Sequence, residues 1–179
     1  MRLTSTMQKF ILHWGEMGAR WGVNRTVAQV HALLYISPRP LPADEIATTL
    51  SVARSNVSTS LRELQSWGLA RVVHVLGDRR NHFETFRDVW TMFRIVLAQR
   101  KRREIDPTMA LLREAVSESS KGGAAETFAR ERLAEMLDFF ETAMQGYEEF
   151  ARMSPAMLQR LVKYGGKVQK LLAGGRTGG

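Results

Sequence analysis

The hydrophobic and polar positions of residues 54–64 repeat with the period of an α-helix that has two unlike faces. At about 100° per residue, the apolar side chains fall on one narrow stripe, formed by Val57, Leu61 and Leu64. The opposite side is polar and is formed by Ser55, Thr59, Arg62 and Ser66. Small hydroxyl groups beside an arginine suit a groove lined by base edges, because hydroxyls donate or accept and arginine can bond guanine twice. The pattern predicts a helix that reads DNA.

An amphipathic helix over about residues 3–20 is predicted by an apolar seam with alternating spacings of four and three. The seam is formed by Leu3, Met7, Phe10, Trp14, Met17 and Trp21. Asn24 can cap a second helix. The inner face of that helix is formed by Val27, Val30 and Leu34. The prolines of residues 37–42 end it, since proline has no backbone donor.

A helix-turn-helix motif is predicted immediately after these prolines. Residues 43–50 form a short helix, and Ser51 and Val52 turn the chain into the reading helix. Gly68 can adopt the left-handed conformation that ends the reading helix, with Leu69 packing back on its last turn.

A β-hairpin is predicted to follow the reading helix. Residues 70–76 are rich in β-branched side chains and predict a strand, residues 77–81 predict a turn, and residues 82–86 the returning strand. The hairpin is a two-stranded wing with Arg79 and Arg80 at its tip.

The rest of the chain predicts helices. A helix begins at residue 87, with Val89 and Phe93 turned inward, and it ends in the basic residues 100–103. Pro107 suits the first position of another helix. The later elements are a break at residues 121–123, a long amphipathic helix over roughly residues 124–152, and a last helix capped by Ser154.

The predicted fold is mainly α: a winged helix-turn-helix with flanking dimerisation helices and a two-stranded β wing. Residues 1–22 form an amino-terminal helix in core or dimer contact, and residues 23–87 form the DNA-binding domain. Residues 88–173 form a helical dimerisation and effector region, and residues 174–179 form a disordered tail.

The charge of the chain is unevenly distributed. The formal net charge is +8, and residues 1–107 hold 16 Lys and Arg against nine Asp and Glu. Residues 108–179 hold ten against nine. The basic excess lies in the half that contains the predicted reading helix, as expected for a surface that meets phosphates.

Several classes of protein are disfavoured. The absence of cysteine excludes disulfides and thiolate metal sites. The four histidines lie on different predicted elements without metal-ligand spacing, and no phosphate-binding loop or nucleophile elbow is present. Neither a membrane-spanning run nor a signal peptide is evident. We therefore expect a cytoplasmic protein that is not an enzyme, binds no cofactor or metal, and has no membrane partner.

Four stretches together resemble the GbsR-like branch of the MarR-type transcriptional regulators, over roughly residues 8–110. They are Asn56–Leu69, the wing Gly77–Asn81, the stretch Asp88–Phe93 and the basic stretch Arg100–Pro107. The resemblance implies a winged helix-turn-helix homodimer that binds a near-palindromic operator, usually as a repressor. Some members respond to choline-like compounds, so a small-molecule effector is a candidate partner, although no ligand-binding motif here matches residue by residue.

The candidate DNA-binding residues combine the helical pattern with this resemblance. The resemblance implies base-reading residues at Ser55, Asn56, Ser58, Thr59 and Arg62, and a wing arginine at Arg79 or Arg80. Arg54, in the first turn of the reading helix, is a candidate for phosphate or base contact. The chain departs from the family pattern at Ala53, where a capping serine is common, and at Ser51, where glycine is common.

Two other functions remain open at this point. One is an architectural DNA-binding protein without effector control, and the other is a winged-helix module whose hairpin contacts protein. The localised basic excess favours DNA over protein as the partner.

Overall fold

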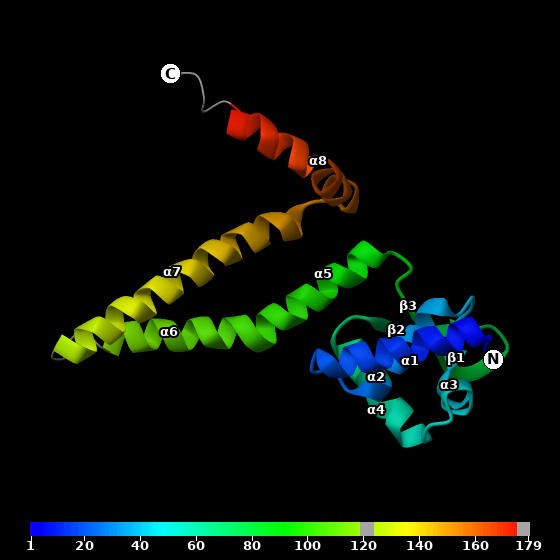
Figure 1. Cartoon of the computed structure of the whole chain (residues 1–179). Coiled ribbons are helices and arrows are strands. Elements are labelled where there is room, and N and C mark those ends of the chain that lie inside the picture. The colour runs from blue at the N-terminus through cyan, green and yellow to red at the C-terminus, as the bar shows by residue number, and fades with distance from the viewer. Residues whose placement is uncertain (119–123, 175–179) are drawn as a thin grey trace. The chain divides into compact units, whose positions relative to one another are not determined.

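The computed structural model describes residues 1–118 and 124–174 of the chain (Figure 1). It forms two compact units, Met1–Val96 and Leu97–Gly179. The first unit is a winged helix-turn-helix, and long helices dominate the second, so the predicted fold class is confirmed. None of the helices within the described residues is long and apolar enough to cross a membrane.

Four helices of the first unit precede the main strands (Figure 1). They are α1 (Ser5–Arg20), α2 (Arg25–Ile36), α3 (Ala43–Leu50) and α4 (Arg54–Ser66). Asn24 caps α2 as predicted, because its side-chain oxygen accepts a hydrogen bond from the Thr26 backbone N–H at 2.8 Å. Thr4 caps α1 in the same way through the Met7 N–H at 3.3 Å.

The turn between α3 and α4 and the end of α4 agree with the sequence. Ser51 takes a left-handed conformation (φ 54°) at the end of α3, a conformation that favours glycine. No side chain caps the start of α4 at Ala53. Gly68 takes φ 74°, and the Leu69 N–H then bonds the Leu64 carbonyl at 2.8 Å, which ends the helix.

The sheet has three antiparallel strands rather than the two that the sequence predicted. The strands are β1 (Leu41–Pro42), β2 (Ala70–Val75) and β3 (Asp78–Thr85), in the order β1-β3-β2. Leu41 pairs with Phe83 of β3 and is fully buried. A two-residue strand containing proline has no recognisable sequence pattern, but proline is tolerated at the edge of a sheet.

The predicted turn over residues 77–81 is wrong, and so is the position of the arginines at the tip. The strands are joined by Leu76 and Gly77 alone, and the φ of 84° at Gly77 permits this tight connection. Asp78 already pairs with Val75, so Arg79 and Arg80 lie within β3.

A bulge in β3 explains why this segment resembles a turn in the sequence. Between the pairs Val75–Asp78 and Val73–His82, one residue of β2 lies opposite three residues of β3. Extra residues on one strand interrupt its regular alternation and redirect its side chains. The bulge spans residues 79–81 and therefore contains both wing arginines.

The core of the first unit lies between α2, α3, α4 and the sheet. Its fully buried side chains include Val30, Leu33, Leu41, Ile46 and Val57. The apolar stripe predicted for the reading helix is confirmed, because Val57, Leu61 and Leu64 are all buried. Its polar side faces outward.

The apolar seam of α1 is only partly buried, contrary to the simple expectation for such a seam. Phe10 and Trp14 are half-buried and stack on each other with ring centroids 5.5 Å apart, while Trp21 is exposed. The fully buried positions of α1 are Ile11, Gly15 and Gly18. α1 packs on α2, and its two buried glycines allow the helices to approach closely.

The helix predicted to start near Pro107 is present, since α6 (Asp106–Glu118) has Pro107 in its first turn, but no break separates it from the helix before it. The helix α5 (Val89–Arg100) continues through a π-helical turn, η1 (Lys101–Ile105), directly into α6 (Asp106–Glu118). Pro107 lacks the N–H that an α-helix would use there, and the wider π turn accommodates this loss without a break.

The inward face predicted for the start of α5 needs a correction too. Met92 is the buried side chain of α5, whereas Val89 and Phe93 are exposed. Trp90, Val96 and Leu97, which the same pattern also turns inward, are half-buried, so the predicted face is wrong at Val89 and Phe93 only.

The second unit also contains α7 (Ala124–Arg152) and α8 (Pro155–Gly174). The bounds of α7 match the prediction, and Ser154 caps α8 through the Met157 N–H at 3.2 Å. α6 packs on α7, and Arg113 pairs with Glu141 across them at 2.8 Å. The break predicted at residues 121–123 and the tail predicted up to residue 179 lie outside the described residues, apart from Gly174, which ends α8.

Gly18 tests the close packing of α1 on α2. A Cβ atom at Gly18 would lie 2.5 Å from the Ala28 Cβ, which cannot move without its backbone. We expect Gly18→Ala to lower the free energy of unfolding by about 1–3 kcal/mol, measured by urea denaturation. Gly15→Ala is the matched control: its Cβ would meet the Gln29 side chain, which can rotate away. Equal losses in both variants would contradict this account.

His31 makes stability depend on pH. Its side chain is buried in α2, its Nε2 has no hydrogen-bond partner among the described residues, and burial lowers its pKa from 6.5 to about 4. Between these values the unfolded chain takes up a proton that the folded chain does not. The free energy of unfolding should therefore be unaffected by His31 above pH 6.5 and fall by up to about 3 kcal/mol as the pH falls to 4.

The measurement is urea denaturation of the wild type and of His31→Leu at several pH values in this window. The difference in stability between them should change with pH, whereas His74→Gln, on the exposed surface of β2, should follow the wild type. Parallel curves for the wild type and His31→Leu would show that His31 does not titrate as described.

Candidate nucleic-acid interface

The outer side of α4 carries most of the predicted DNA-binding residues. Burial of its apolar stripe against α2, α3 and β2 turns the opposite side outward. The exposed members of the predicted set on this helix are Arg54, Ser55, Asn56, Thr59 and Arg62. Ser58 is half-buried.

A groove of about 310 Å³ lies beside α4, between this helix, the start of α3 and strand β3. Of the eight predicted residues, it brings together Arg54, Ser58, Arg62 and Arg80. The remaining four do not line it, namely Ser55, Asn56, Thr59 and Arg79. The groove thus joins the reading helix to the wing through residues that are far apart in the sequence.

The groove also contains polar residues that the sequence analysis missed. These are Asp44, Gln65 and Asn81. Gln65 lies three positions after Arg62 and seven after Ser58, a helical spacing that could have revealed it. Asn81 follows the wing arginines directly. Nothing in the sequence indicated Asp44, because an acidic residue is not expected beside phosphates.

Arg62 lies at the centre of the exposed face without an acidic partner among the described residues. Its Nη2 donates a hydrogen bond to Thr59 Oγ1 at 3.2 Å, which holds the guanidinium over the polar side of α4. The remaining N–H groups are available for base edges or phosphates.

The two wing arginines differ in their surroundings. Arg80 binds Asp78 through Nε at 3.0 Å and through Nη2 at 2.6 Å, whereas the Arg79 side chain makes no ion pair or hydrogen bond in the part of the chain described. The hydrogen bonds from Arg80 hold the pKa of the Asp78 carboxyl well below its usual range. The same bonds raise the pKa of Arg80. Arg80 is thus held in place, and Arg79 is free to reach outward.

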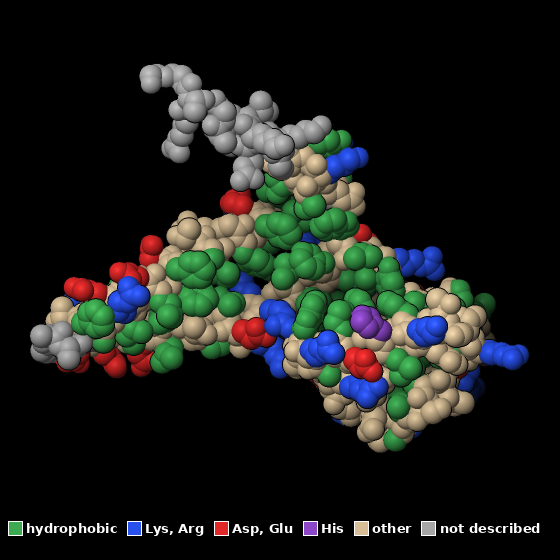
Figure 2. Space-filling view, in the orientation of Figure 1, with side chains coloured by type: hydrophobic (Ala, Val, Ile, Leu, Met, Phe, Trp, Pro, Cys, Tyr) green, Lys and Arg blue, Asp and Glu red, His purple; other side chains and the backbone are tan. Residues whose placement is uncertain are grey.

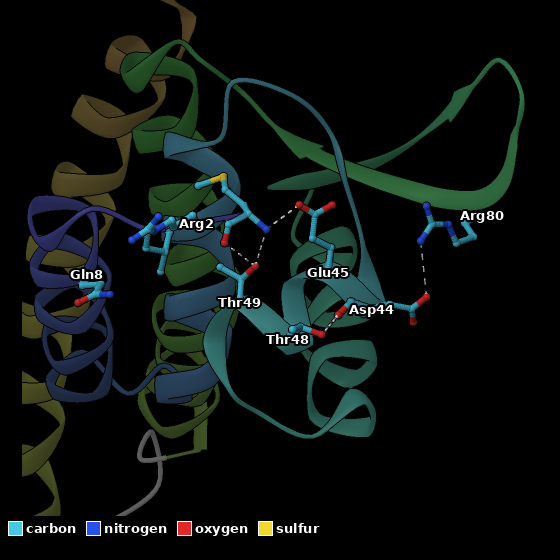
Figure 3. Close-up of a pocket in the computed structure, with 9 residues that line it drawn as sticks. Arg2, Gln8, Asp44, Glu45, Thr48, Thr49 and Arg80 are labelled. Carbon is cyan, nitrogen blue, oxygen red and sulfur yellow. Dashed lines mark hydrogen bonds and ion pairs between the residues drawn. The ribbon is translucent and has the colours of Figure 1, made fainter.

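Asp44 connects the wing to the start of the reading helix. Its carboxylate forms an ion pair with Arg54, and its Oδ2 lies 4.0 Å from Arg80 Nη1. Figure 3 shows Asp44 and Arg80 facing each other across the gap between α3 and β3. Three charged groups from three elements therefore meet at one end of the groove.

The arrangement of these side chains suits the binding of nucleic acid better than catalysis or metal binding. Within residues 1–118 and 124–174, no cluster of His, Asp and Glu could hold a metal ion. His82 is buried and bonds the Arg80 carbonyl oxygen through Nδ1 at 2.9 Å, which supports the bulged strand. A rim of arginines, hydroxyls and amides along one helix and one wing offers donors to phosphates and base edges.

Comparisons with known proteins agree with this geometry. The model of the MarR family matches residues 21–81, which span α2, α3, α4, β2 and the start of β3. No curated protein gives a match.

Two solved structures are similar to the chain. A crystal structure described as that of a transcriptional regulator is 21% identical, with a TM-score of 0.52, over 80% of this chain and 99% of the other. The transcriptional regulator Tm0710 from Thermotoga maritima is 16% identical, with a TM-score of 0.38, over 83% of this chain and 94% of its own. The first supports the fold alone.

The family match also bears on catalysis, because the matched model belongs to transcriptional regulators and not to enzymes. The expectation that the protein is not an enzyme is confirmed in this way. Residues 21–81 form a winged helix-turn-helix domain that matches the MarR family of DNA-binding transcriptional regulators.

Proposed function

We propose that this protein is a sequence-specific transcriptional repressor of the GbsR-like branch, acting in the cytoplasm as a homodimer on a near-palindromic operator. In this proposal α4 enters the major groove, where Ser55, Asn56, Ser58, Thr59 and Arg62 read bases. The wing arginines Arg79 and Arg80 reach the adjacent minor groove, and Arg54 contacts the backbone or a base.

The observation that carries the proposal is the groove between α4 and β3. Arginines from both elements line it, and the polar side of α4 is exposed next to it. A helix and a wing that are offset in this way can contact neighbouring grooves of one duplex. The basic excess of residues 1–107 supplies the electrostatic attraction.

Repression follows from geometry in this proposal. A dimer whose reading helices lie about one helical turn of DNA apart, or about 34 Å, occupies two half-sites and blocks transcription. A small-molecule effector would act by binding one arrangement of the dimer more tightly than another, because equal affinity for both would shift nothing.

Arg62→Ala tests the reading face. Duplexes selected by the wild type from a random pool should contain a near-palindrome. Fluorescence anisotropy should show that Arg62→Ala weakens binding to the selected duplex about 5- to 150-fold, the loss expected for one bidentate base contact.

The matched control is Arg113→Ala, which removes the same charge from α6 and should change the affinity by less than twofold. Equal affinity of the wild type for selected and scrambled duplexes would favour an architectural DNA-binding protein instead. No affinity for either duplex would favour a protein-interaction module.

The homodimer is supported by an apolar surface on α7. Phe128 and Phe139 are 65% and 66% exposed, and their separation of 11 residues brings them to one side of the helix. Figure 2 shows hydrophobic side chains at the surface along α7, bordered by acidic ones. Large exposed apolar side chains at helical spacing mark a surface that another chain covers. A second copy is the occupant that the two-half-site operator requires.

Phe139→Glu tests this surface. We expect the wild type to sediment at twice the chain mass of 20.3 kDa. Phe139→Glu should raise the dissociation constant at least tenfold, because each protomer loses a buried phenylalanine worth about 1.5–3 kcal/mol.

Gln145→Glu adds the same charge to another exposed position of α7 and should leave the dimer intact. A monomeric wild type, or a Phe139→Glu dimer of unchanged affinity, would contradict the role of α7.

A further inference from the structure

Asp44 is an acidic residue in a groove that otherwise offers donors to DNA. Among the residues that line the groove it is the one carboxylate, beside Arg54, Arg62 and Arg80. It belongs to the first turn of α3, where a negative charge favours the amino-terminal end of a helix. Glu45 lies in the same turn and supplies a negative charge there as well. Stabilisation of the helix therefore does not explain why the Asp44 carboxylate faces the arginines.

The contacts of Asp44 link three elements of the interface. One carboxylate oxygen pairs with Arg54 Nη1, in the first turn of α4. The other lies 4.0 Å from Nη1 of Arg80, whose Nη2 pairs with Asp78 at 2.6 Å. Each carboxylate oxygen of Asp44 is therefore directed to an arginine that the proposed interface needs.

These ion pairs contribute little to stability. The side chains of Asp44, Arg54 and Arg80 are 45%, 61% and 55% exposed, so water screens the attraction between them. A contact that is weak in the free protein is easily exchanged for a contact with a ligand. The ligand that competes for guanidinium groups in this groove is a phosphate or a base edge.

Glu45 shows what Asp44 does differently. It is the next residue of α3 and carries the same charge, but its side chain lies about 100° further around the helix. There it accepts hydrogen bonds from the Met1 ammonium at 2.8 Å and from Arg39 Nη2 at 2.6 Å. Glu45 does not line the groove beside α4. The two neighbours form a natural pair for comparison.

We propose that Asp44 limits the affinity for DNA by competing with phosphates and base edges for Arg54 and Arg80. DNA must displace the carboxylate from both arginines while Asp44 repels the phosphates, so binding is weakened. The base contacts along α4 are added to this weakened background on the operator alone. The inference rests on the proposed DNA-binding face of α4 and the wing.

Asp44→Asn removes the charge while keeping the size of the side chain. On a scrambled duplex, we expect its affinity to rise about five- to tenfold, and the slope of log K against log salt to steepen by about 0.9 for one additional phosphate contact. On the selected duplex the gain should be of the same size, because the same carboxylate is displaced there, so the ratio of specific to non-specific affinity should not change. Glu45 attracts Arg80 but forms no ion pair with it among the described residues, so Glu45→Gln should change both affinities by less than twofold and leave the slope unchanged.

A double variant tests whether the effect passes through Arg54. In the Arg54→Ala background, Asp44→Asn should increase the affinity for the scrambled duplex by less than half as much as it does alone, on a logarithmic scale. Thermal unfolding of each variant by circular dichroism verifies the fold.

The proposal is overturned if Asp44→Asn leaves non-specific affinity and the salt slope unchanged. It is also overturned if Glu45→Gln reproduces the effect, because general charge would then explain it. A loss of affinity for both duplexes would instead show that Asp44 only positions Arg54. The scrambled duplex tests Asp44 even if the wild type shows no sequence preference, in which case the repressor proposal fails and the competition is still measured.

Discussion

Burial of one apolar stripe on α4 is the interaction on which the interface depends. Val57, Leu61 and Leu64 are buried in the core of the first unit, where α4 packs on α2, α3 and β2. Because a helix is rigid, burial of this stripe also fixes the direction of every side chain on the opposite face. The polar face of α4 is exposed because the apolar face is buried, so no other element is needed to turn it toward DNA.

The wing is positioned by a second constraint, the bulge in β3. Regular alternation would turn Arg80 and Asn81 to opposite faces of the sheet, yet both line the groove beside α4. The bulge relaxes that alternation. Asp78 then pairs with Nη2 of Arg80, and Asp44 approaches its Nη1. The arginine closest to the reading helix is thus oriented by two carboxylates before DNA is present.

In the second unit, α7 carries apolar side chains on two of its sides. One side of α7 is half-buried and holds residues such as Leu137 and Met144, while Phe128 and Phe139 occupy a different side that stays exposed. A helix with apolar side chains on two sides has more apolar surface than one neighbouring helix can cover. The apolar surface of α7 that remains exposed in a single chain is the surface that the second chain covers in the proposed dimer.

The amino-acid sequence by itself determined the helices, the turn at Ser51, the stop at Gly68 and the outward face of α4, because these depend on local periodicity and on single residues. It did not reveal β1, the bulge over residues 79–81 or the continuous path through Pro107, since a strand pair or a π turn is selected by contacts with distant residues. The groove and the position of Asp44 between Arg54 and Arg80 were likewise decided by the tertiary structure alone. Those three residues are separated in the sequence, and only the packing of α3, α4 and β3 brings their charges together.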